Sequence, residues 1–164
     1  MDEIERVTQS LEASYLALAG ALIIPDLCAA LESPRGGTTP ERYQRWFDEN
    51  VAPKCQRLIT GEDCYWFRSA FLHQGSSQHP GAKYKRVFFV EGAIGLDMGT
   101  WRRIHADQYG LHLHIAYFCE LMVSSARDWL DRVRDTDVFR ANYDRFMRRH
   151  YFDIEPYSGM SVIT

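Results

Sequence analysis

The sequence predicts a mainly α-helical fold: an antiparallel helical bundle with one small β-hairpin inserted before the longest helix. Apolar residues recur at steps of three and four along several stretches, which places them on one face of a helix. Helix start and stop signals bracket these stretches. A single stretch, 84–90, is instead rich in residues that favour strands. The 164 residues fit one domain, 1–164.

The first predicted helix begins near Ile4. Its stripe is formed by Ile4, Val7, Leu11, Ser14 and Leu18. We expect Pro25 to kink or end this helix, because proline removes a hydrogen-bond donor and clashes with the preceding turn. The apolar run 15–24 is then about half the length that a membrane-spanning helix needs. The sequence therefore predicts no membrane partner.

The next two helices carry clear start signals. Thr39 followed by Pro40 combines a hydroxyl cap with a proline in the first turn. Thr60 stands three residues before Asp63, the spacing of a capping box. Gly75 suits the left-handed position that ends the second of these helices.

The remaining elements follow in the order strand, helix, helix. We expect a strand at 84–90 that turns and returns as a hairpin over about 84–98. Apolar spacing then predicts a long helix over 111–134 and a last helix over 137–149. The tail from about 152 contains Pro, Gly and Ser, and we expect it to be irregular.

Composition narrows the class of protein. The net charge of −3 argues against a dedicated duplex-DNA binder, which usually has a basic face. The four cysteines include no Cys-x2-Cys pair, so we expect buried free thiols, as in a reducing cytoplasm. The acidic N-terminus lacks the basic and apolar regions of a secretory signal. We therefore expect a cytoplasmic location.

Arg68 and His73 form an Arg-x4-His pair near the end of the helix at 60–75. An arginine holds phosphate with a charged fork of donors, and a histidine exchanges protons near neutral pH. The pair is thus typical of half a phosphodiester-cleaving site. Residues five apart do not stack on a helix, so we expect them to meet only if the last turn unwinds. Alternatively, Arg68 pairs with an acid such as Glu62 or Asp63, and His73 caps carbonyls.

The stretch Cys-Tyr-Trp-Phe-Arg-Ser-Ala-Phe-Leu-His-Gln-Gly, residues 64–75, resembles the signature helix of the HEPN (higher eukaryote and prokaryote nucleotide-binding) superfamily. Members of this superfamily are helical bundles of similar size with an Arg-x4–6-His motif, here after two or three predicted helices. Many are metal-independent ribonucleases of toxin–antitoxin and antiviral systems, and they dimerise so that two motifs line one cleft.

The resemblance implies roles for individual residues. Arg68 would hold the scissile phosphate, and His73 would act as general acid or base, with 2′,3′-cyclic phosphate and 5′-OH ends as products. Ser69 stands where many members have Asn, Asp or His and would support the pair. The implied partners are an RNA substrate, a second copy of the chain and an antitoxin or effector protein, without a cofactor or metal. The alternative is a non-catalytic HEPN-like module that dimerises or binds a protein.

Two further groups of residues have functional and structural interpretations. His112 and His114, with His79 and His105 upstream, could ligate a metal from a strand, although capping or solvated histidines are the commoner outcome. A basic set could track an RNA backbone, with Tyr84 and Trp101 for stacking, or could protect a strand edge from aggregation. That set consists of Lys83, Lys85, Arg86, Arg102 and Arg103. The second Arg-x4-His match, Arg145 and His150, is interpreted as a cationic helix end.

Overall fold

The computed structural model describes residues 14–76, 78–81, 83–84, 86–90, 99–105, 108–147, 149–151, 155–156 and 158–163. Of 99–105, 108–109 and 149–150 only the backbone is described. The protein is mainly helical, as the sequence predicts. Its helices are α2 (Ser14–Glu32), α3 (Pro40–Asn50), α4 (Gly61–Gln74), α5 (Ile115–Val133), α6 (Asp137–Tyr143) and the short 3-10 helix η2 (Ala52–Cys55).

Helix α2 is the centre of the fold and packs against α3, α4, α5 and α6. It runs without a break through Pro25, so the expectation that Pro25 ends it is wrong. Packing from several sides holds the helix together, and the Tyr43 hydroxyl donates a hydrogen bond of 3.0 Å to the Leu22 carbonyl. By length and composition α2 could cross a membrane, the one such helix among the described residues. Its place in the core is consistent with a soluble protein.

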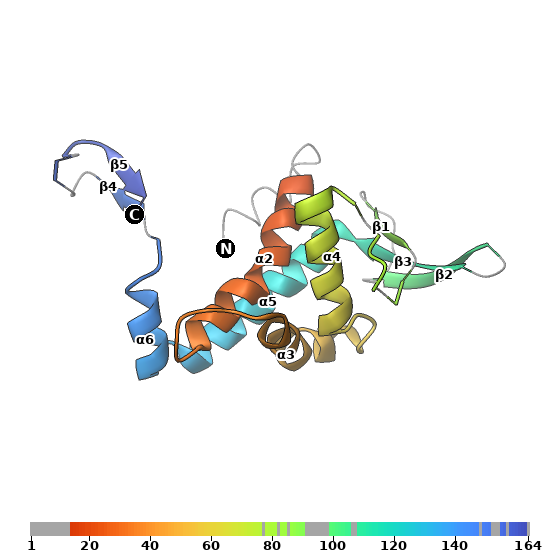
Figure 1. Cartoon of the computed structure of the whole chain (residues 1–164), viewed down its shortest axis with the longest axis horizontal. Coiled ribbons are helices and arrows are strands. Elements are labelled where there is room, and N and C mark those ends of the chain that lie inside the picture. Colours follow the sequence, from red (N-terminus) through yellow and green to blue (C-terminus); the bar gives the residue numbers. More distant parts are fainter. Residues whose placement is uncertain are drawn as a thin grey trace.

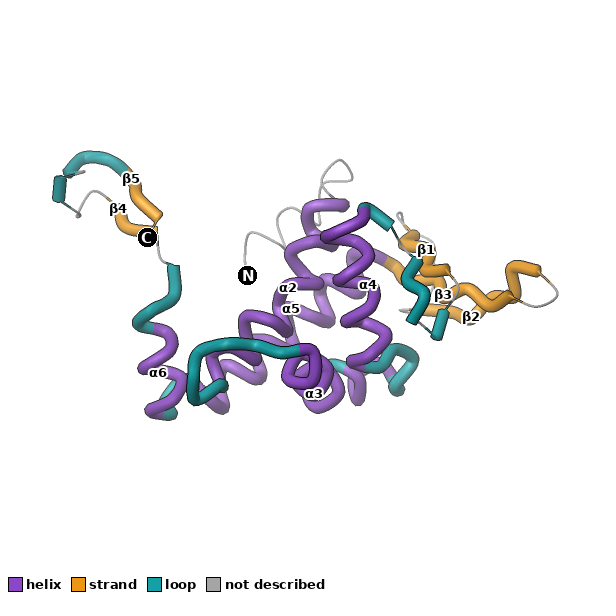
Figure 2. The backbone as a smooth tube through the Cα atoms, viewed as in Figure 1, coloured by secondary structure: helices purple, strands orange, loops and turns teal. Residues whose placement is uncertain are grey.

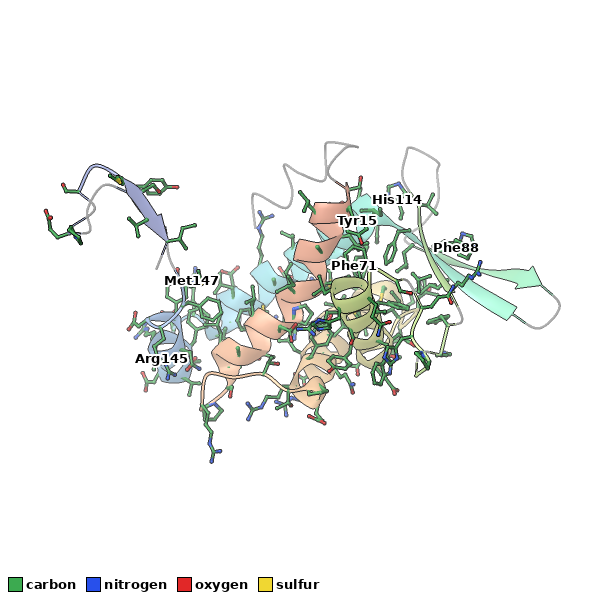
Figure 3. The ribbon with its side chains drawn as sticks, turned by 45° about the horizontal axis from the view of Figure 1, so that its top comes forward. Tyr15, Phe71, Phe88, His114, Arg145 and Met147 are labelled. Carbon is green, nitrogen blue, oxygen red and sulfur yellow. The ribbon has the colours of Figure 1, made fainter. Side chains whose placement is uncertain are left out.

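The helices do not form a fully antiparallel bundle. The N-terminal ends of α2 and α5 lie together, because Tyr15, Leu18 and Ile115 line one cavity, so these two helices run in the same direction. Helix α4 runs the opposite way, and its Phe71 ring lies 4.4 Å from that of Tyr15 between centroids (Figure 3). Helices α2 and α5 run in the same direction because α3 crosses the other helices, as its nearly end-on view in Figure 1 shows. A crossing helix does not reverse the chain direction.

A three-stranded sheet lies beside α4 (Figure 1). It contains β1 (Arg86–Val90), β2 (Gly99–His105) and β3 (Gln108–His114) in the order β1-β3-β2. The predicted strand at 84–90 is confirmed over 86–90 as β1, whereas its predicted return over 91–98 lies outside the described residues. β1 pairs with β3 in parallel, and the antiparallel pair is β2 with β3.

Strand β3 corrects the predicted start of the long helix. Residues 111–114 belong to β3, and the helix begins only at Ile115. Leu111 and Leu113 are fully buried, while His112 and His114 are half-buried, which is the period-two alternation of a strand. Leu111 fits the two-residue period of a strand as well as the apolar spacing of a helix. The helical stripe predicted from Leu111 onward therefore hid the strand.

The C-terminal part ends in a small hairpin. Helix α6 stops at Tyr143, earlier than predicted, and β4 (Arg149–Tyr151) pairs antiparallel with β5 (Ser161–Ile163). The tail from about 152 is thus not wholly irregular, because it carries β5. Figures 1 and 2 show this hairpin standing away from the helices. Asn142 ties α6 to the end of α2 through Nδ2, which donates to the Leu31 carbonyl at 2.9 Å.

Candidate functional site

Helix α4 is fixed at both ends, which makes it a firm support for Arg68 and His73. At its start Thr60 and Asp63 form the predicted capping box, with the Asp63 carboxylate accepting from the Thr60 backbone N–H at 3.1 Å. At its end Gly75 adopts the left-handed conformation at φ 59°, as predicted. The sequence signals at 60–75 therefore describe this helix correctly.

Arg68 pairs with a residue that the sequence interpretation did not consider. Its Nε donates to Oδ2 of Asp26, on α2, over 2.8 Å. The side chains of Arg68 and Asp26 are 24% and 13% exposed, so the pair is largely shielded from water. The partner is an acid, as the structural alternative expects, but it is neither Asp63, which serves the capping box, nor Glu62, which is exposed.

His73 meets Arg68 although the helix does not unwind. The Nη1 atom of Arg68 lies 3.3 Å from Nε2 of His73, and α4 remains helical as far as Gln74. The expected unwinding is wrong because the long arginine side chain spans the offset between positions five apart. Arginine has no acceptor, so Nε2 must accept the hydrogen bond. In this contact Nε2 therefore offers its lone pair to the guanidinium, which places the ring N–H on Nδ1.

Burial and the neighbouring charge act on the Asp26 carboxylate in opposite directions. Burial raises the pKa of Asp26, and the charge of Arg68 offsets this rise only in part. Beside the pair, Tyr43 Oη lies 3.2 Å from the Cys64 sulfur. Since the Tyr43 proton goes to the Leu22 carbonyl, the Cys64 thiol is the donor in that contact. Burial raises the pKa of Tyr43 well above its usual range, so this wall of the site is uncharged.

The access to the two residues differs. His73 is exposed, and Arg68 is half-buried at the surface between α2 and α4. Ser69 is half-buried beside Arg68, and we find no hydrogen-bond partner for it among the described residues. The motif thus opens to solvent on its histidine side.

Four of the five predicted RNA-binding residues are described, and they lie on the sheet or just before it. Arg86 is exposed on β1, and strand pairing places the backbones of Arg86 and Arg102 on either side of Gly110. Lys83 is exposed with its Nζ 5.5 Å from the ring centre of Tyr84. Tyr84 itself is buried and donates to the Leu58 carbonyl, so it cannot stack on a base.

The side chains of three predicted RNA-binding residues, Lys85, Arg102 and Arg103, lie outside the described part of the structure. The side chain of Arg103, like that of Arg102, lies outside the described atoms, and Lys85 lies outside the described residues. The pairing of Arg103 with Tyr109 in the β2–β3 ladder fixes its backbone alone. The structure therefore places Arg86, Arg102 and Arg103 in one sheet without showing a joint basic surface.

The histidines outside the motif have structural partners. His112 stacks on Phe88 with ring centres 4.8 Å apart, and His114 Nδ1 accepts from the Tyr117 N–H at 3.4 Å to cap α5. His79 stacks on Trp66 at 4.1 Å. Within the described part of the chain no group of three potential metal ligands occurs. The side chain of His105 lies outside that part.

The second Arg-x4-His match does not form a pair on one element. Arg145 follows α6 and donates to Asn142 (Figure 3 labels Arg145), whereas His150 belongs to β4. This agrees with a structural role for Arg145. Arg68 and His73 thus meet on one helix, whereas the side chain of His150 lies outside the described atoms.

Asp26 is the site residue that sequence reasoning missed. It is the only charged residue between Ser14 and Leu31. A lone acid in an otherwise apolar helix needs a partner when the helix is buried, because an unpaired buried charge is costly. The expected kink or end of the helix at Pro25 hid this signal, because it divides the apolar stretch in which Asp26 is the lone acid.

No known family model, curated protein or solved structure matches the chain. The resemblance to the HEPN superfamily therefore rests on the residues of α4.

Proposed function

We propose that this protein is a HEPN-like, metal-independent endoribonuclease that acts as a homodimer in the cytoplasm, in a defence or toxin–antitoxin setting. The observation that carries the proposal is the 3.3 Å contact between Arg68 Nη1 and His73 Nε2 on the solvent side of α4. It brings a phosphate-binding cation and a proton-exchanging group within reach of one phosphodiester. The four buried free cysteines agree with a reducing compartment.

The two residues divide the work of RNA cleavage. With Nε held by Asp26, the Nη atoms of Arg68 remain to bind the phosphate oxygens, which displaces Nη1 from His73. The freed Nε2 of His73 accepts the proton of the ribose 2′-OH. The O2′–P bond forms and the P–O5′ bond breaks, which leaves a 2′,3′-cyclic phosphate. A second histidine, released from its arginine in the same way and protonated at Nε2, gives its proton to O5′, which leaves a 5′-OH end.

A homodimer provides the second histidine. Each copy contributes one His73, so one acts as base and the other as acid across a shared cleft. Helix α2 exposes apolar side chains around the motif, Leu27 directly after Asp26 and Tyr15 and Leu16 at its N-terminal end. Burial of these side chains against a second copy would supply part of the binding energy.

The structure also contains an observation in favour of the alternative, a non-catalytic HEPN-like module that dimerises or binds a protein. Asp26 already neutralises Arg68 inside the fold, and a guanidinium in a shielded ion pair contributes to packing without any substrate. In that case the exposed apolar side chains of α2 would bind the partner while the Arg68–His73 contact stays a structural feature.

Cleavage of RNA in EDTA separates the two functions. We expect the native protein to cut a mixed single-stranded RNA and to leave cyclic-phosphate ends. His73→Ala should lose at least about 100-fold in rate, because general acid–base catalysis contributes roughly 10²–10⁴. End analysis of the products and a time course of cleavage measure both.

His150→Ala is the matched control, because it removes the histidine of the other Arg-x4-His match. This variant should cleave like the native protein. Retained cleavage in His73→Ala would reject Arg68 and His73 as the active site. A well-folded native dimer that leaves RNA intact would favour the partner-binding module.

A further inference from the structure

The ion pair of Asp26 with Arg68 has an unusual division of donors. A carboxylate often grips the arginine fork with both oxygens, but here only Nε and Oδ2 form the bond, at 2.8 Å. The Nη1 end of the same guanidinium points to His73 at 3.3 Å. Among the described residues we find no partner for Nη2. The planar fork is therefore held at one edge and open at the other.

We propose that Asp26 is a positioning residue, which orients the guanidinium of Arg68 so that Nη1 faces His73 and thereby keeps Nε2 of His73 unprotonated. The inference deepens the proposed function and rests on it only for its catalytic consequence. The geometry itself concerns three side chains from two helices, α2 and α4.

Three observations support a positioning role over simple packing. First, Asp26 is 13% exposed, so water competes little for its carboxylate. Second, the guanidinium is planar, so fixing Nε also fixes the direction of Nη1 and Nη2. Third, Tyr43 and Cys64 satisfy each other and the Leu22 carbonyl, so they do not compete for Arg68.

The consequence for His73 follows from the donor inventory. Arginine offers hydrogens only, so a histidine that faces it must present a lone pair. The proton of neutral His73 is then on Nδ1, and Nε2 is ready to accept another proton. A solvated histidine without this neighbour favours the opposite arrangement, with its proton on Nε2. Loss of Asp26 should therefore change which ring nitrogen of His73 carries the proton, although His73 itself is not substituted.

Nitrogen NMR of the full chain at pH 8 tests this directly and needs no RNA. Long-range proton–nitrogen spectra report which ring nitrogen of His73 carries the proton, and the His73→Ala spectrum assigns the signals. We expect the Nδ1–H tautomer to dominate in the native protein. Asp26→Asn should shift His73 toward Nε2–H and speed the solvent exchange of Arg68 Nε–H.

Asp128→Asn is the control, since Asp128 also binds a cation, Lys54 at 2.6 Å, but on the exposed surface. It should leave the His73 signals unchanged. Circular dichroism of both variants checks the fold, and Asp26→Glu, which keeps the charge, should restore part of the native tautomer. A native protein with His73 mainly in the Nε2–H form would overturn the inference, as would an unchanged His73 in Asp26→Asn.

The catalytic consequence is measured separately. In the RNA assay Asp26→Asn should lower kcat roughly 10- to 100-fold with a smaller change in KM, because misorientation of a catalytic group by about 1 Å can cost 10²-fold. If the native protein does not cleave RNA but the NMR result holds, the proposed function fails and the positioning role of Asp26 stands. Full cleavage by Asp26→Asn would remove the catalytic part of the inference.

Discussion

At the scale of single residues, the position of Asp26 decides what Arg68 can do. The sequence places Arg68 five residues before His73, but this spacing alone does not orient the guanidinium. Orientation comes from the carboxylate 42 positions upstream, which holds Nε at 2.8 Å. A positively charged group that is fixed on one side and open on the other can recruit an anion at its open side.

The buried thiols provide a prediction about pH. Burial raises the pKa of Cys64 to about 12, because the thiolate would lose its hydration. In the unfolded chain this thiol deprotonates near pH 9. The native state therefore keeps a proton that the unfolded state releases, and stability is complete below about pH 9 and falls as pH rises toward 12.

Urea unfolding at pH 7.5 and pH 10 measures this effect. Cys64 should account for a loss of about 1 kcal/mol in the free energy of unfolding at pH 10. Cys64→Ala is the comparison, since it removes one thiol and leaves the other titrating groups in place. An equal loss in the variant and the native protein would contradict the assignment to Cys64.

Ellman's reagent should leave all four cysteines of the native protein unmodified at pH 8.

At the scale of elements, the crossing of α3 and α4 positions the helix of the candidate site. Gly61 begins α4 where it touches α3, and a Cβ built on Gly61 would lie 2.1 Å from the Gln44 carbonyl oxygen. The Asp48 carboxylate accepts from the Gly61 N–H at 2.7 Å. Only glycine allows the two backbones to come this close.

Gly61→Ala should therefore destabilise the protein by about 1–3 kcal/mol or more, the cost of forcing atoms into a filled contact. Gly37→Ala is the matched control, because a Cβ on Gly37 meets nothing within 4 Å. Urea denaturation of the two variants gives the difference in free energy of unfolding. Equal stability of the two would show that α3 and α4 do not cross at Gly61.

The elements differ in how far the sequence predicts them. Helices α3 and α4 have caps that act within a few residues, Thr39 and Thr60, and both are where the sequence predicts them. The start of α5 is wrong by four residues, because Leu111 fits a strand and a helix equally well. Only the pairing of β3 with β1 and β2 resolves this ambiguity.

At the scale of the whole molecule, the C-terminal hairpin stands apart from the helical core. Within the described residues, β4 and β5 contact chiefly each other. Tyr151, Met160 and Ile163 are all more than half exposed. A two-stranded hairpin by itself is at best marginally stable in water, so it adds little to the stability of the helices.

Removal of residues 148–164 should therefore change the Tm by no more than a few degrees. Asn142→Ala is the contrasting variant, because buried Asn142 donates to the carbonyls of Leu31 at 2.9 Å and Ser33 at 2.7 Å. Its loss should cost about 1–3 kcal/mol by leaving buried acceptors unpaired. Thermal unfolding measures both, and a truncation as damaging as Asn142→Ala would mean that the hairpin supports the core.

The sequence by itself determined the mainly helical class, the caps of α3 and α4, strand β1 and the Arg68–His73 pair as a candidate, because each depends on neighbours within a few positions. Tertiary structure alone decided that α2 continues through Pro25, that α2 and α5 run in the same direction, and that β3 replaces the first turn of the long helix. It also brought Asp26 to Arg68. Such outcomes depend on packing and pairing between distant segments, whose free energies override local preferences.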